Sequence, residues 1–224
     1  MSRFSRPHLI GLLAALLLPL PAGAAEMTFS LVDFSASAKC GQKCPQVIAA
    51  EGEITARTPR AFVDFVGKNI GSGRLHSIVL LHSPGGQVVA SMELGTALRK
   101  IGAAAIVARV GEGATGRGGQ VRAGRCYSAC VYTLMGAAKR VVPPQSHVGI
   151  HRMFMYEANA NPESTSALSR TYASEPLVAR LGEYAEVMGV STELVWAAES
   201  ISPDKIRIVS ATELRRWKLA APKL

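Results

Sequence analysis

The chain is poor in aromatic residues, which make up 6% of its 224 residues, so few side chains could stack on nucleic-acid bases. Positive charge is in excess, with 25 Lys and Arg against 16 Asp and Glu. These basic residues do not form one stripe but are spread over Arg57–Arg60, Arg99–Lys100, Arg117–Arg125 and Arg207–Lys218. We therefore expect no nucleic-acid partner.

Long hydrophobic runs are also lacking, because the apolar stretch Leu9–Leu20 is too short to cross a bilayer as a helix. Arg3 and Arg6 precede it, and the small residues of Pro21–Ala25 follow it. This order is typical of a secretory signal peptide over residues 1–25, cleaved after Ala24 or Ala25. The mature protein is then expected in the periplasm or outside the cell, with no membrane span.

Cysteine is limited to four residues, Cys40, Cys44, Cys126 and Cys130. An even number in an exported chain indicates disulfides, for which three pairings exist. Two C-x3-C pairs could instead hold zinc, but an oxidising compartment favours disulfides and no metal is expected. Cys126 and Cys130 lie one helical turn apart if the segment is helical, a spacing that needs distortion to bridge. We therefore predict cross-pairing with Cys40 and Cys44.

Hydrophobic patterns predict an α/β domain over residues 47–224, preceded by an irregular, cysteine-containing lead-in at 26–46. Leu75–Leu81 is an almost continuous apolar run of the kind found in strands buried on both faces. Helical and strand-like stretches alternate around it, which is typical of βαβ units. The predicted strands are 47–54, 75–81 and 104–110, and the predicted helices are 58–70 and 88–101.

The second half of the domain begins with a glycine-rich stretch, Gly111–Arg125, that lacks the Gly-Lys-Ser/Thr ending of a P-loop. It is predicted to be a surface loop or a mobile lid. Beyond it we expect a buried helix at Tyr127–Met135, strands at 139–142 and 147–150, and helices from Glu163 onward. Ser210–Glu213 has the pattern of a capping box.

Three features could carry chemistry together. Ser83–Gly86, sequence SPGG, follows the buried strand, and its glycines can expose backbone N–H groups that stabilise an oxyanion. Ser128 lies near the start of a helix, and His151 ends a strand. Taken one by one, such features are more often an ordinary turn, a helix cap and a structural histidine.

Their order along the chain resembles the Clp protease proteolytic subunit (ClpP) and its crotonase-like superfamily, most closely the exported Clp-like proteins with cysteines flanking the serine. The resemblance covers about residues 47–220 and is strongest at Leu80–Val88 and Cys126–His151. It implies a ClpP/crotonase-like fold of stacked βαβ units with a helical C-terminal part.

The resemblance also implies roles for particular residues. Ser128 would be the nucleophile and His151 the general base, with the N–H groups of Gly86 and Ala129 as oxyanion donors. The acid of the family precedes a Ser-Ala segment, which Ser210 and the next residue match.

Counting from that segment and from the preceding Gly189 gives two different positions, neither of them acidic. Asp204 lies between them and is the predicted third residue, with Glu199 as the alternative.

The predicted function is that of an exported serine hydrolase, a peptidase acting on envelope or secreted polypeptides without metal or cofactor, and as a homo-oligomer. The alternative is a catalytically inactive Clp-like binding or scaffold module stabilised by disulfides. Acyl-CoA chemistry is disfavoured because exported proteins do not normally meet coenzyme A.

Overall fold

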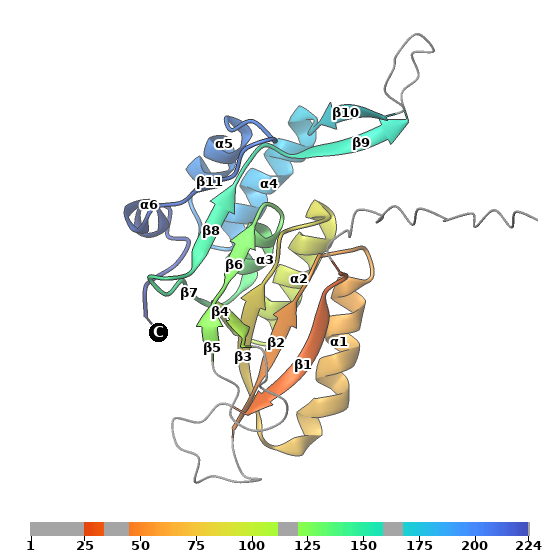
Figure 1. The fold of residues 1–224 in the computed structure, drawn as a ribbon, viewed down its shortest axis with the longest axis vertical. Helices are drawn as coiled ribbons and strands as arrows, with labels where there is room; N and C mark the ends of the chain where they lie inside the picture. Colours follow the sequence, from red (N-terminus) through yellow and green to blue (C-terminus); the bar gives the residue numbers. More distant parts are fainter. Residues whose placement is uncertain (1–24, 34–44, 112–120, 159–167, 224) are drawn as a thin grey trace, which may run out of the picture.

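A computed structural model describes residues 25–33, 45–111, 121–158 and 168–223 of the chain. Its centre is a six-stranded sheet with the order β1-β2-β3-β4-β5, in which β7 also pairs with β4 (Figure 1). The β2–β3, β3–β4 and β4–β7 pairs are parallel, which confirms the predicted α/β class. The strands are β1 (Thr28–Asp33), β2 (Gln46–Glu51), β3 (Leu75–His82), β4 (Ala104–Val110), β5 (Val121–Ala123) and β7 (Lys139–Val141).

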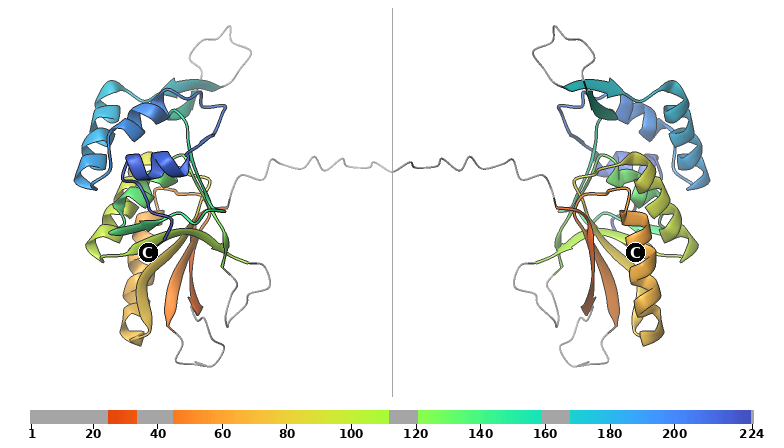
Figure 2. Two further views of the ribbon diagram at one scale, coloured as in Figure 1. Left: turned by 90° about the vertical axis from the view of Figure 1, so that its left-hand side faces the viewer. Right: turned by 90° about the vertical axis from the view of Figure 1, so that its right-hand side faces the viewer.

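Two helices connect the parallel strands: α1 (Thr58–Asn69), followed by the short 3-10 helix η2 (Ile70–Ser72), and α2 (Val88–Lys100). They lie on one side of the main sheet (Figure 2). Apolar residues at helical spacing explain this placement, because Phe62 of α1 and Leu94 and Leu98 of α2 are buried in the core. The predicted helices 58–70 and 88–101 are therefore confirmed to within a residue.

A second, three-stranded sheet has the order β11-β8-β6 and comprises β6 (Arg125–Tyr127), β8 (His147–Ile150) and β11 (Arg207–Ile208). Ser83, just beyond β3, joins the two sheets. Its N–H donates to the carbonyl of Arg125 (2.8 Å), and its own carbonyl accepts from the N–H of Tyr127 (3.1 Å). The segment after β3 is thereby aligned beside β6, which leads to Ser128.

Helix α3 (Cys130–Gly136) follows β6 and is wholly buried. It packs closely on α2, because a Cβ atom on Gly136 would lie 2.1 Å from the carbonyl oxygen of Gly95. The predicted helix at Tyr127–Met135 therefore begins too early, since Tyr127 belongs to β6. Strand pairing with β8 holds residues 125–127 extended, a non-local effect that the local apolar pattern does not reveal.

The C-terminal part contains a hairpin and three helices. Strands β9 (Phe154–Ala158) and β10 (Leu168–Tyr172) form a ribbon that extends away from the main body, and α4 (Glu175–Val187), α5 (Glu193–Glu199) and α6 (Ala211–Arg216) follow (Figure 1). The expectation of helix from Glu163 onward is wrong for β10. The capping box at Ser210 and Glu213 is confirmed.

Two further expectations need correction. The lead-in at 26–46 is not irregular throughout, because β1 pairs antiparallel with β2 along its whole length. The stretch Gly111–Arg125 is not all loop, because β5 pairs with β4. Residues 112–120 lie outside the described residues, as does the predicted signal peptide up to residue 24. In the part of the chain that is described, no helix is long and apolar enough to cross a membrane.

Candidate active site

Ser128 occupies a sharp turn between β6 and α3. Its φ of +54° lies in the left-handed region, which costs a non-glycine residue about 1–3 kcal/mol. Two hydrogen bonds hold the turn: the N–H of Ser128 donates to the carbonyl of Gly149 (2.9 Å), and the N–H of Val131 donates to the carbonyl of Ser128 (3.0 Å). A serine on a strained strand-to-helix turn has the geometry of a nucleophile elbow.

A disulfide between Cys126 and Cys130 spans this turn, and both cysteines are fully buried. The predicted cross-pairing with Cys40 and Cys44 is therefore wrong. The prediction assumed a helix at this point, but the reversal at Ser128 brings the two Cα atoms to 5.2 Å, well within the range of disulfides. Cys40 and Cys44 themselves lie outside the described residues.

The SPGG turn lies directly against Ser128. Gly85 and Gly86 have φ values of +114° and +134°, which only glycine adopts readily. A Cβ atom on Gly85 would lie 2.8 Å from both the Cβ of Ser128 and the carbonyl oxygen of Tyr127. The second glycine is equally confined, because a Cβ there would lie 2.0 Å from the carbonyl oxygen of Ile54. Both positions therefore require glycine for two reasons: their φ angles are positive, and neighbouring atoms leave no space for a Cβ.

Two backbone N–H groups beside Ser128 are available to a ligand. The N–H of Gly86 and the N–H of Ala129 donate to no hydrogen bond among the described residues. Two hydrogen bonds hold the backbone just before Gly86. The N–H of Gly85 donates to the Oγ of Ser83 (3.1 Å), and the N–H of Ile54 donates to the carbonyl of Gly85 (2.8 Å). Unpaired donors that are held in place by their surroundings suit an oxyanion hole.

His151 follows β8 and lines the same small cavity as Ser128, together with Ala129, Ile150 and Met153. The Nδ1 of His151 lies 2.8 Å from the carbonyl oxygen of Arg152. A carbonyl oxygen can only accept, so the ring proton is on Nδ1 and the lone pair on Nε2 is free to act as a base. No hydrogen bond joins Ser128 to His151 within the described chain; such bonds often tighten only when substrate binds.

Asp204, the predicted third residue, does not orient His151. Its exposed carboxylate forms two hydrogen bonds with the guanidinium of Arg170 in β10, of 2.8 and 3.0 Å. The hydrogen bonds from Arg170 hold the pKa of Asp204 below its usual value. The prediction failed because the partner comes from the β9–β10 hairpin, which the sequence pattern did not reveal. The Arg170 guanidinium also lies over the ring of Phe154, 4.7 Å from its centroid.

Glu199 is the carboxylate that lies within electrostatic reach of His151. Its side chain is 12% exposed and accepts a hydrogen bond from the N–H of Met153 (3.1 Å), with the guanidinium of Arg152 at 3.5 Å. Burial raises the pKa of Glu199, while His151 is among the weaker influences that lower it. Glu199 was the predicted alternative to Asp204, and its position at the end of α5 brings it beside the segment that follows β8.

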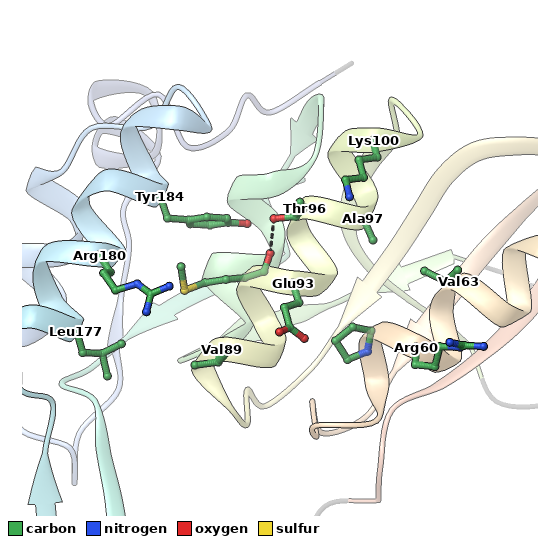
Figure 3. A pocket seen from close by; sticks show the side chains of 12 residues that line it. Arg60, Val63, Val89, Glu93, Thr96, Ala97, Lys100, Leu177, Arg180 and Tyr184 are labelled. Atoms are coloured by element: carbon green, nitrogen blue, oxygen red, sulfur yellow. Dashed lines mark hydrogen bonds between the residues drawn. The ribbon is translucent and has the colours of Figure 1, made fainter.

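A wider groove of about 660 Å³ lies elsewhere, on α1, α2 and α4 (Figure 3). Apolar side chains such as Val63, Val89 and Leu177 line it, together with the charged Arg180 and Glu93. Neither a histidine nor a cysteine is among its lining residues, and the hydroxyl of Thr96 is bonded to the carbonyl of Met92 (2.8 Å). This groove therefore lacks the nucleophile and base that Ser128 and His151 provide.

Comparisons with known proteins show the fold. No protein-family model and no curated protein matches the chain.

Two solved structures of the 1510-N membrane-bound stomatin-specific protease are similar to it. One, a serine-to-alanine variant, has a TM-score of 0.52 at 17% identity and covers 79% of this chain and 78% of its own. The other, a lysine-to-alanine variant with a substrate peptide, has a TM-score of 0.53 at 18% identity and covers 79% and 74%. The chain thus has the mixed α/β fold of these neighbours.

Proposed function

We propose that the chain is a serine-type peptidase. The observation that carries the proposal is the strained Ser128, which lies beside two unpaired N–H groups and shares a cavity with His151, whose Nδ1 lies against the carbonyl of Arg152. A polypeptide substrate is supported by the fold neighbour that binds a substrate peptide.

The reaction follows from these positions. The Nε2 of His151 takes the hydroxyl proton as the Oγ of Ser128 attacks the peptide carbonyl, and the N–H groups of Gly86 and Ala129 stabilise the negative charge on the carbonyl oxygen. The imidazolium then returns the proton to the leaving amine, which leaves an acyl ester on Ser128. A water molecule, deprotonated by the same ring, hydrolyses this ester and regenerates the serine.

The backbone carbonyl of Arg152 performs one part of the usual acid's role, because it selects the His151 tautomer by accepting from Nδ1. Glu199 performs the other, since a nearby negative charge favours the imidazolium that forms during the reaction. Because the Arg152 carbonyl selects the tautomer and Glu199 supplies the negative charge, the mechanism does not need a carboxylate that is hydrogen-bonded to the His151 ring.

A fluorophosphonate probe tests the central claim, because it labels an activated serine. The mature protein should be labelled, Ser128→Ala should not, and Ser200→Ala, which removes an exposed serine, should be labelled like the natural protein. Hydrolysis of a dye-labelled unfolded polypeptide should follow the same pattern. Absence of labelling in correctly folded protein would instead identify a binding or scaffold module.

A second comparison tests the roles of the two carboxylates. Glu199→Gln should lower the labelling rate about fivefold to tenfold, on the order of 1 kcal/mol for a nearby, partly buried charge. Asp204→Asn should change it less than about twofold, because its carboxylate is bound to Arg170. Pseudo-first-order labelling rates, measured for each variant under the same conditions, give both effects. The reverse ranking would restore Asp204 as the acid.

We also propose that the protein is exported. The predicted signal peptide supports this, as does the Cys126–Cys130 disulfide, which is typical of oxidising compartments. Expression of the full chain followed by N-terminal sequencing of the envelope and secreted fractions should give a mature protein that begins at Ala25 or Glu26. Recovery of the uncleaved chain in the cytoplasm would contradict export.

A further inference from the structure

A cavity of about 460 Å³ at the start of β6 and β8 is lined by cationic and hydrogen-bonding side chains. None of its lining residues is acidic, and they come from five strands and the turns between them. The residues are His82, Arg109, Ala123, Gly124, Arg125, Gln145 and His147.

The two arginines of this cavity are available to a ligand. Neither Arg109 nor Arg125 has an ion pair with any residue in the described part of the chain. The guanidinium of Arg125 contacts the ring of Tyr127, 5.8 Å from its centroid. Arg125 and His147 are direct partners in the β6–β8 register, so their side chains project from the same face of the sheet.

His82 adds a neutral donor. Its Nδ1 accepts a hydrogen bond from the N–H of Arg125 (3.0 Å), so the ring proton of the neutral form is on Nε2. Burial lowers the pKa of His82, the nearby Glu51 raises it, and Arg125 and Arg109 lower it further. Glu51 is the carboxylate that acts on His82, but its Oε1 already accepts from the N–H of Val110 (2.7 Å). Its charge balances only one of the two guanidinium groups.

We propose that this cavity binds a phosphate group, either free or carried by a larger molecule. Guanidinium groups from β4 and β6 line one cavity with ring or amide donors from β3, β8 and the turn before β8, and an arginine fork matches the oxygens of a phosphate group. Two guanidinium groups that line one cavity repel each other, and a bound anion relieves that repulsion. Arg125 lies three residues before Ser128, about 10 Å along an extended strand, so the phosphate site is separate from the reacting atoms.

Calorimetric titration of the mature protein with inorganic phosphate, at constant ionic strength set with chloride, tests the proposal. The pocket variant is Arg109→Gln/Arg125→Gln. A control variant with the same net charge, Lys100→Gln/Arg180→Gln, removes two cations from the groove of Figure 3 instead. Phosphate should bind to the natural protein and to the control, with a Kd at least about tenfold higher in the pocket variant.

A second arm distinguishes free phosphate from a lipid headgroup. Sedimentation with phosphatidylglycerol vesicles, compared with phosphatidylcholine vesicles, is measured for the same three proteins. Vesicle binding that is lost only in the pocket variant would support the site and identify a headgroup as the source, whether or not free phosphate binds. Equal losses in the pocket and control variants, or no binding of either probe to the natural protein, would overturn the proposal.

Discussion

Replacement of Gly85 by alanine is the sharpest structural test of the proposed site. The new Cβ would lie 2.8 Å from the Cβ of Ser128 and from the carbonyl oxygen of Tyr127, and 3.2 Å from the N–H nitrogen of Ala129. Because two of these three atoms belong to the backbone, side-chain rotation cannot relieve the overlap. The serine, or the N–H group beside it, must move.

The expected magnitude has two parts. Alanine at a φ of +114° costs about 1–3 kcal/mol of stability, because this region is almost exclusive to glycine. Displacement of the nucleophile or oxyanion donor by several tenths of an ångström should lower reactivity further, since about 1 Å of misplacement can cost 100-fold. We therefore expect the second-order rate constant of fluorophosphonate labelling to fall at least about tenfold in Gly85→Ala.

Gly102→Ala is the matched control. Gly102 also has a positive φ, of +63°, but a Cβ there would meet nothing within 4 Å. This variant should lose about 1 kcal/mol of stability with unchanged labelling. Labelling rates are compared per folded molecule, at a temperature well below each unfolding midpoint measured by circular dichroism. A Gly85→Ala protein that is folded and labelled as fast as the control would refute the proposed contact between the SPGG turn and the nucleophile.

Two further predictions concern stability. Cys126→Ala/Cys130→Ala removes the cross-link around Ser128 and should lower the free energy of unfolding by about 2 kcal/mol for so short a loop, which urea unfolding measures; an unchanged midpoint would contradict it. Glu213 is hydrogen-bonded to Arg207 and to the N–H of Ser210, and these bonds lower its pKa from 4.5 to about 2. A depressed carboxyl pKa stabilises the fold above the unfolded-state value and loses that effect as pH falls, so the melting-temperature difference between Glu213→Gln and the natural protein should shrink from pH 4.5 towards about 2. A constant difference across that window would show that the charge of Glu213 contributes nothing.

The Cys126–Cys130 disulfide is an exception to the rule that cysteines four residues apart on a helix are poorly placed for a bridge, because these two cysteines do not lie on one helix. Cysteines four residues apart on a regular helix are poorly placed for a bridge, and the sequence pattern around Tyr127 favours a helix. Strand pairing with β8 and the left-handed turn at Ser128 change the path of the chain between Cys126 and Cys130. The pairing therefore depended on one dihedral angle that residue types do not specify, because serine rarely adopts it without tertiary support.

The sequence by itself determined the parallel sheet, its crossover helices and the capping box, because these depend on apolar periodicity and on side chains close together in the chain. It also identified Ser128, His151 and the SPGG turn as candidates, through the order of short motifs. Only the tertiary structure decided what surrounds them. The partner of the His151 ring is a backbone carbonyl, which every residue carries and no motif marks. Asp204 forms its hydrogen bonds with Arg170, which lies in the β9–β10 hairpin more than thirty positions earlier in the chain. The hydrogen-bond partners of these side chains depend on which distant segments of the chain come together. That is a property of the folded chain, and no local stretch of sequence determines it.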